Sequence, residues 1–194
     1  MQKKSLWQTI KRMWYNNFTN FSSQRRNSMY NAKEIAEFFL SIDTDDVLKS
    51  ENKIVKNGRN IIVGSTKLNK FLHLSQNIYI AKTGNLLFND TVLAYDNGGV
   101  IYGVQGSFYT LKKTYRNTSL CFDKETEDFL KRMYIVLKDA PLDKLIELSH
   151  QDPSWKEKHN GYTLEEQIMT PLKYLEDYKN RYKDVLQLME GLKV

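Results

Sequence analysis

Apolar residues recur at helical spacing along most of the chain, and this pattern predicts a mainly helical protein. The clearest run begins after Thr66 and continues at 3.6-residue spacing as far as Gly84. Thr66 can cap this helix because its hydroxyl can accept from first-turn amides, and Gly84 can end it because glycine readily adopts the left-handed conformation. We expect this segment to be the central helix.

Helices are also expected on both sides of the central one. Asn31 followed by Glu34 is a relative of the capping box and predicts a helix over 32–42. Asp123 predicts the start of a helix that ends near Lys138. The other segments expected to be helical are 100–109, a helix opened by Pro141 and ending at His150, a short turn after Asp152-Pro153, and a long closing helix from Thr170-Pro171 to residue 189, with a capping box at Thr163 to Glu166.

Two stretches interrupt the helical pattern. Asn57-Gly58 lies between two β-branched runs, which predicts a β-hairpin. A short extended run over 91–95 is followed by a turn, in which Gly98 and Gly99 permit a positive φ or a close backbone approach. The fold class expected is mainly α: a single compact helical domain over 28–194 with a small β-hairpin element.

Residues 1–27 differ from the rest of the chain in charge. They contain no acidic residue and six basic ones: Lys3, Lys4, Lys11, Arg12, Arg25 and Arg26. The net charge of +6 therefore belongs to this segment, because the remaining 23 Lys and Arg equal the 23 Asp and Glu. The domain over 28–194 is neutral in sum, which argues against a global nucleic-acid-binding surface.

The same segment has the pattern of an N-terminal amphipathic helical arm. Leu6, Ile10, Met13 and Trp14 are spaced as one apolar face among the basic residues. This face can pack on the domain or on a partner chain, and the basic side chains can instead contact nucleic acid or a membrane surface. The sequence leaves these alternatives open.

Composition limits the classes of protein to which this chain can belong. Hydrophobic residues make up 41% of 194 residues, enough for one packed domain. Cys121 is the single cysteine, so the chain has no internal disulfide and no cysteine-rich zinc site, which suits a reducing cytoplasm. No run reaches the roughly 18 apolar residues that cross a bilayer, and the N-terminus lacks the pattern of a signal peptide. We expect a cytoplasmic protein without a membrane span.

The sequence offers three candidate functional sites, a metal triad, a phosphate loop and a reactive cysteine, and each has a simpler explanation. His150, Asp152 and His159 can be drawn as a metal triad, but their spacing is that of no reliable zinc motif; the simpler role for His150 is to bond to nearby carbonyls and pack on Trp155. The glycines of 98–106 lack the lysine of a phosphate loop, which favours a turn. Cys121 near a helix start has no identifiable partner histidine, which favours a filler cysteine. We therefore expect no catalytic residue, metal or cofactor, and no enzyme.

Two blocks of the sequence resemble a known family. The first, over 66–100, is a Lys-Leu-rich helix followed by Leu87-Phe88, Ala94-Tyr95 and Gly98-Gly99-Val100. The second is Leu148-Ser149-His150 with Pro153 and Trp155. In this order they resemble the Panacea domain of SocA-like antitoxins, over roughly 29–182. Three departures are Gly99 in place of the usual proline, the longer linker with Asn57-Gly58, and residues 1–27, which have no counterpart.

The resemblance implies a bacterial or phage protein of a toxin-antitoxin system, of the kind associated with phage defence. It would neutralise a cognate toxin by protein-protein interaction, and one relative delivers its toxin to the ClpXP protease. The residues that carry the motifs or suit partner binding are Trp7, Trp14, Lys67, Tyr95, Gly98, Gly99, His150 and Trp155. The alternatives are a nucleic-acid-binding regulator that acts through residues 1–27 and an enzyme built on His150 and Asp152.

Overall fold

The computed structural model describes residues 30–56, 58–117 and 120–194. The arm expected over 1–27, with Trp7 and Trp14, lies outside the described residues, as does Asn57. The described chain is a mainly helical domain, as predicted. Its helices are α2 (Ala32–Ile42), α3 (Thr66–Thr83), α4 (Tyr102–Thr114), α5 (Lys124–Leu137), α6 (Leu142–His150), α7 (Pro153–Lys158), α8 (Leu175–Arg181) and α9 (Lys183–Glu190), with short 3-10 turns η1 (Tyr115–Asn117) and η2 (Pro171–Tyr174).

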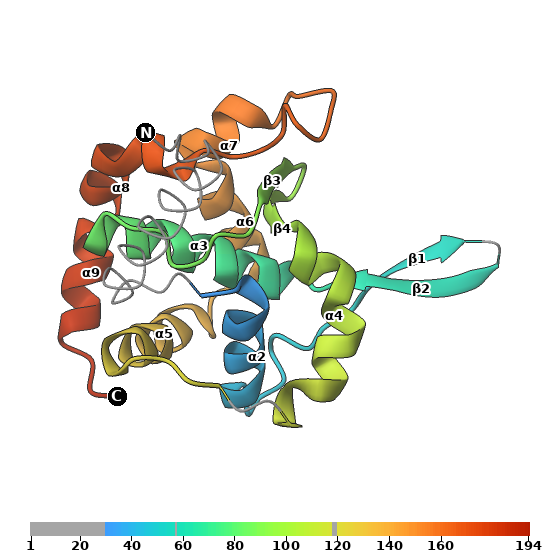
Figure 1. Ribbon diagram of the computed structural model, residues 1–194, viewed down its shortest axis with the longest axis horizontal. Coiled ribbons are helices and arrows are strands. Elements are labelled where there is room, and N and C mark those ends of the chain that lie inside the picture. Colours follow the sequence, from blue (N-terminus) through green and yellow to red (C-terminus); the bar gives the residue numbers. More distant parts are fainter. Residues whose placement is uncertain (1–29, 57, 118–119) are drawn as a thin grey trace, which may run out of the picture.

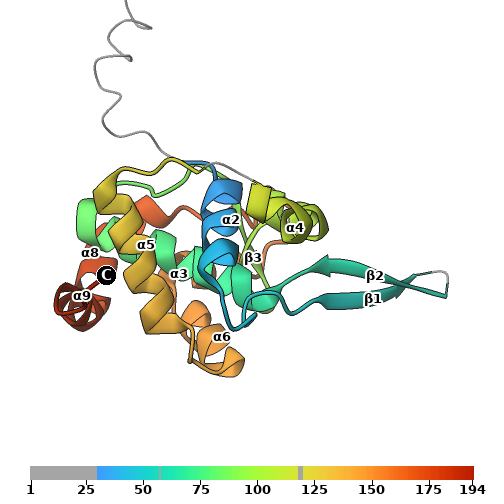
Figure 2. The ribbon, with the colours of Figure 1, turned by 90° about the horizontal axis from the view of Figure 1, so that it is seen from below.

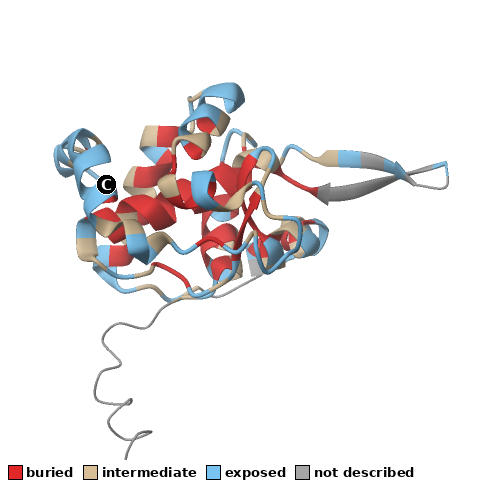
Figure 3. Cartoon of the chain, turned by 90° about the horizontal axis from the view of Figure 1, so that it is seen from above, coloured by how far each residue is buried: buried red, intermediate tan, exposed pale blue. Residues whose placement is uncertain are grey.

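Helix α3 runs through the middle of the molecule and contacts α2, α5, α6, α8 and α9 (Figure 1). It is buried around most of its circumference, whereas the neighbouring helices show exposed faces (Figure 3). Its prediction as the central helix, ended by Gly84 with φ of 74°, is confirmed. The N-cap is Ser65, one residue before the predicted Thr66. Ser65 is extended and its hydroxyl accepts from the Leu68 amide, while Thr66 is already helical.

Caps that depend on near neighbours are placed as predicted. The Asn31 side chain and the Glu34 carboxylate form both bonds of a capping box at the start of α2. Asp123 caps α5, and Asp152 caps α7. Pro141 lies one position before the first residue of α6 and not within its first turn.

The described chain contains two hairpins where one was predicted. The first joins β1 (Asn52–Lys56) to β2 (Arg59–Gly64) and projects from the helical body (Figures 1 and 2). The second joins β3 (Val92–Tyr95) to β4 (Gly98–Ile101) and lies against α3. The helix expected from residue 100 therefore starts later, at Tyr102, because residues 98–101 pair with β3.

The long closing helix is broken into three parts, which corrects the prediction. A 3-10 turn, η2, precedes α8, and Tyr182 then leaves the helical conformation with φ of −99° and ψ of 9° before α9 begins. The Thr163 and Glu166 bonds of a capping box are present, but the chain there forms turns and no helix follows. None of the helices in the described ranges is long and apolar enough to cross a membrane.

Candidate functional site

The two blocks that carry the resemblance meet around a buried row of polar side chains. His73 of α3 lies between Ser149 of α6 and Asp152 at the start of α7. Its Nδ1 is 2.8 Å from Ser149 Oγ, and its Nε2 is 2.6 Å from Asp152 Oδ2. All three residues are at most 1% exposed. Side chains that are more than 70 residues apart in the sequence thus form one network, which we call the His73 network together with Lys70, Asn77 and Tyr178.

Asp152 is the acceptor at one end of the His73 network. Oδ1 accepts from the Ser154 amide and from the Tyr178 hydroxyl, each at 2.8 Å. Oδ2 accepts from Asn77 Nδ2 at 2.8 Å as well as from His73. Burial alone would raise the pKa of the Asp152 carboxyl, but these hydrogen bonds, first of all the one from His73, hold the pKa below its ordinary value. Asp152 therefore remains ionised at neutral pH inside the protein.

The arrangement of donors assigns the protons of His73. The Gly99 amide and Lys70 Nζ both donate to Ser149 Oγ, at 3.1 and 3.3 Å, so the Ser149 hydroxyl proton is free to point at His73 Nδ1. His73 Nε2 then carries the ring proton and donates to Asp152. The result is a continuous path of hydrogen bonds from Lys70 to Asp152.

Lys70 is the other end of the His73 network, and its environment is unusual for a lysine. It has no exposed surface. Its amine donates to the Gly99 carbonyl at 2.9 Å and to Ser149 Oγ, and no carboxylate in 30–56, 58–117 or 120–194 forms an ion pair with it. Because burial penalises the charged form, it lowers the pKa of Lys70 to about 7.

The glycine pair covers the His73 network, which explains why β4 begins with two glycines. A Cβ on Gly98 would overlap the Ser149 hydroxyl and lie 2.7 Å from Lys70 Nζ, and Gly98 has φ of 93°. A Cβ on Gly99 would lie 2.7 Å from the His73 ring. Both expectations for these glycines, a positive φ and a close backbone approach, are thus realised. Gly99 also donates its amide to Ser149, a bond that a proline at this position could not make.

The order Ser149, His73, Asp152 is that of a hydrolytic triad, but its burial does not suit that chemistry. A nucleophile must contact its substrate, and the Ser149 side chain is fully enclosed and covered by Gly98. The arrangement instead ties α3, β4, α6 and α7 together through hydrogen bonds between buried groups. The His73 network therefore connects these elements as a structural framework.

Five of the predicted motif residues come together beside this framework. The indole of Trp155 donates to the Tyr95 carbonyl at 2.9 Å, and His150 Nε2 is 2.8 Å from the Asp96 carbonyl. His150 stacks on one side of Trp155 at 4.2 Å, as predicted, and His159 stacks on it at the same distance. The residues brought together are Tyr95, Gly98, Gly99, His150 and Trp155. Lys67 lies elsewhere, with its amine on the Lys138 carbonyl at 2.8 Å.

His150, Asp152 and His159 do not form a metal triad. His150 faces a backbone carbonyl, and both oxygens of Asp152 accept hydrogen bonds from protein donors. Within the part of the chain that the structure describes, no three His, Cys, Asp or Glu side chains are grouped to hold a metal ion. The prediction that Cys121 fills a gap in the core is wrong, because Cys121 is exposed.

Lys70, His73 and Asn77 were missed as site residues. They are three and four positions apart, so they lie on one face of α3, and polar residues in an otherwise buried helix are the signal that points to a network. The sequence indicates Ser149 only as part of a motif, and Asp152 only as the start of a short helical turn and as a metal or catalytic partner of His150. Comparison of the chain with protein-family models, with curated proteins and with solved structures finds no match.

Proposed function

We propose that this protein acts by binding another protein, and that its partner is a toxin that it holds inactive. The observation that carries this proposal is the enclosure of the His73 network. Its Ser149, His73 and Asp152 are withdrawn from solvent and satisfied by each other, which favours a framework that supports a binding surface over a catalytic centre. Hydrogen bonds between buried side chains of this kind rigidify a core.

The class of partner rests on the resemblance to the Panacea domain. Its two sequence blocks, 66–100 and 148–155, supply every member of the His73 network except Tyr178, and they supply the stack of His150 on Trp155. The resemblance implies a toxin encoded beside this gene, neutralised by occlusion or by delivery to a ClpXP-type protease. Residues 1–27 would provide part of the contact, with Trp7 and Trp14 as anchors, since tryptophan is favoured among residues that dominate binding energy.

Co-expression tests the proposal. The neighbouring reading frame should arrest growth when expressed alone, and co-expression of this protein should restore growth and allow the two chains to copurify. Alanine at Trp7 and Trp14 should weaken copurification, while the same change at the exposed Tyr162, which lies on the described surface, should not. A neighbouring product that is harmless, or that still arrests growth in the presence of this protein, contradicts the proposal.

The distribution of charge favours a second candidate, binding to nucleic acid through residues 1–27. Six basic and no acidic side chains fall in this segment, while the rest of the chain is neutral in sum. Such binding should weaken steeply with added salt, because each phosphate contact releases counterions. Filter binding of a DNA duplex by the full chain and by a chain lacking 1–27 measures this. Binding that survives the deletion contradicts the assignment to this segment.

A further inference from the structure

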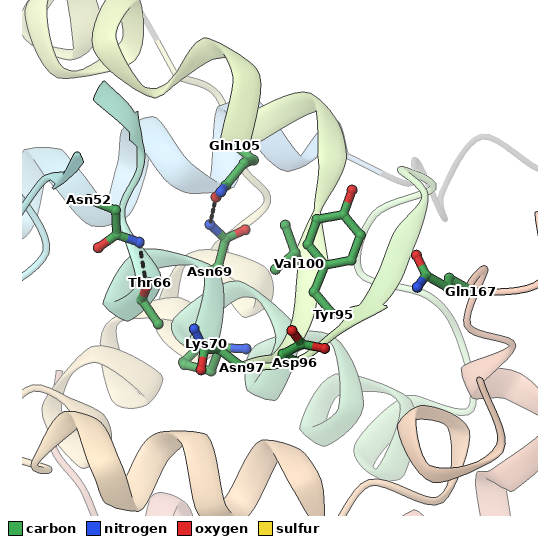
Figure 4. A pocket seen from close by; sticks show the side chains of 10 residues that line it. All are labelled: Asn52, Thr66, Asn69, Lys70, Tyr95, Asp96, Asn97, Val100, Gln105 and Gln167. Carbon is green, nitrogen blue, oxygen red and sulfur yellow. Dashed lines mark hydrogen bonds between the residues drawn. The ribbon is translucent and has the colours of Figure 1, made fainter. Parts of the chain in front are cut away.

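A cavity of about 340 Å³ lies beside the His73 network (Figure 4). It is bounded by the start of α3, the β3–β4 turn, α4 and the loop that carries Gln167. Its volume is at the lower end of the range of small-molecule sites, which suits a ligand of about the size of an amino acid. No role in the framework described above accounts for this cavity.

Lys70 contributes to the inner wall of the cavity and lacks a counter-ion there. Its amine is held by the Gly99 carbonyl and Ser149 Oγ, which satisfy two of its three donors when it is protonated. A buried ammonium without an anionic partner is costly, and the same cost is reflected in its pKa of about 7. An anionic group that enters the cavity would supply the missing negative charge beside the buried amine.

Amide side chains make up much of the remaining wall. Gln105 uses its Oε1 to accept from Asn69 at 2.7 Å, and its side chain lines the cavity. Asn97 and Gln167 add further amides, and Val100 is the apolar side chain of the wall. Such a wall matches a polar ligand with several hydrogen-bonding atoms.

Asp96 lies at the exposed part of this wall, on the β3–β4 turn. Its carboxylate would repel an anion nearby but would attract a ligand ammonium. A cation at one end and a carboxylate at the other therefore suit the two charged residues of the cavity, Asp96 and Lys70. The charges select a zwitterion with its carboxylate directed inward.

We propose that this cavity binds the carboxylate of a small polar zwitterion, with Lys70 as its counter-ion and the amides of Gln105 and Asn97 as hydrogen-bond partners. The carboxylate belongs either to a free amino acid or to the C-terminus of a short peptide. Either ligand would add a contact between α3 and the β3–β4 turn. The cavity wall contains no residue of 1–27, the segment proposed to provide part of the toxin contact.

Proton linkage gives the site a recognisable signature. Binding of an anion requires the charged form of Lys70, so the affinity should fall as the pH rises above about 7, by about tenfold per pH unit in the limit. The other titratable groups around the amine are His73 on α3, Asp152 at the start of α7, and Tyr95 and Asp96 on the β3–β4 turn. α4 contributes the neutral Gln105 to the cavity.

Calorimetric titration of the full chain with L-glutamine and with the peptide Gly-Gly-Gln tests the site. Each probe is compared with its C-terminally amidated form, which has the same shape but no carboxylate. Saturable binding of at least one free probe, with no binding of its amide, supports the proposal, and the probe that binds identifies the source of the carboxylate. Absence of saturable heat from both free probes, or equal binding of the amidated forms, overturns it.

Three variants complete the test. Lys70→Met should weaken binding by at least about tenfold, because it removes the positive charge of the wall that faces the ligand carboxylate. Lys67→Met is the matched control, since Lys67 is on the same helix but bonds to the Lys138 carbonyl away from the cavity. Gln105→Glu retains the acceptor for Asn69 and should also weaken binding by adding a negative charge to the wall. Equal affinity of the Lys70→Met or Gln105→Glu protein and the wild type contradicts the proposal.

Discussion

The histidines of this protein occupy two neighbouring but different environments. His73 is buried, and both of its ring nitrogens contact side chains of other segments, Ser149 and Asp152. His150 and His159 lie at the edge of the molecule, where they stack on Trp155 and bond to backbone carbonyls. The same residue type is a connecting element of the core in one place and an aromatic packing element in the other.

The difference arises from the location of the partners along the chain. The contacts of His150 and His159 with Trp155 span only a few residues, and the one with His150 is predicted from the sequence. The partners of His73 come from segments 76 and 79 residues away. A histidine with distant side-chain partners holds segments together, and its loss should affect the whole fold, whereas loss of a stacked histidine should be felt locally.

The largest effect is expected where the His73 network ends in a charge. Asp152→Ala removes an acceptor used by His73, Asn77, Tyr178 and the Ser154 amide, all of them buried. The free energy of unfolding should fall by about 3–5 kcal/mol, because the donors are left without a partner. Urea denaturation followed by circular dichroism measures this change.

Asp152→Asn tests the contribution of the negative charge, because asparagine has nearly the same shape as aspartate but is neutral. The pKa of Asp152 is held below its ordinary value, so the wild type should keep this contribution at neutral pH and lose it as the pH falls below about 4, through the folded pKa. The Asp152→Asn protein should lack this part of the acid dependence. If wild type and variant lose stability in parallel on acidification, Asp152 is not ionised in the folded protein.

Lys70 should impose the opposite pH dependence at the other end of the His73 network. Its folded pKa of about 7 lies below the ordinary value of 10.5, so between these values the unfolded chain binds more protons and stability rises with pH. The rise should approach about 4 kcal/mol between pH 7 and pH 10.5. Denaturation of the wild type, of Lys70→Met and of Lys67→Met across this range measures it. The Lys67→Met protein should retain the rise and the Lys70→Met protein should lose it.

Much of the fold is readable from the sequence because helix ends are fixed by local groups. Asn31, Asp123 and Gly84 mark ends of α2, α5 and α3 through bonds or conformations within a few residues. Strand β4 was missed because its pairing with β3 and its burial against α3 outweigh the weak preference of Gly98 and Gly99 for strands. The break at Tyr182 likewise has no signal in the local sequence, and the Tyr182 side chain remains buried where the helix ends.

The candidate site was predictable only in part, for the same reason. Tyr95, Gly98, Gly99, His150 and Trp155 were identified by a resemblance in sequence order, and the structure brings them together. The roles of Lys70 and His73 depend on segments that no local spacing connects to α3. From the sequence alone, Lys70 cannot be distinguished from the other polar residues of this helix, because its neighbours come from distant segments.

The glycine pair offers a test of how tightly the His73 network is covered. Gly98→Ala places a methyl group against Ser149 and Lys70 in a left-handed conformation, whereas Gly84→Ala has the same type of φ but nothing within 4 Å of the new Cβ. Gly84→Ala should cost about 1 kcal/mol of stability through conformation alone. Gly98→Ala should cost about 2 kcal/mol more through overpacking. Equal losses of the free energy of unfolding, measured by urea denaturation, would show that the backbone at Gly98 can move away from Ser149 and Lys70 without an energetic cost.

The smallest effect is expected at the stacked histidines, and it completes the comparison with His73. His150→Ala removes a stack on Trp155 and a hydrogen bond of 2.8 Å to the Asp96 carbonyl, while His159→Ala removes an equivalent stack and a longer bond of 3.2 Å to the Lys156 carbonyl. Each should cost about 1 kcal/mol in urea denaturation, with the larger loss for His150, because its bond fixes the β3–β4 turn. A loss at His150 as large as that of Asp152→Ala would show that the edge of the molecule carries as much of the fold as its buried network, and the distinction between the two environments would fail.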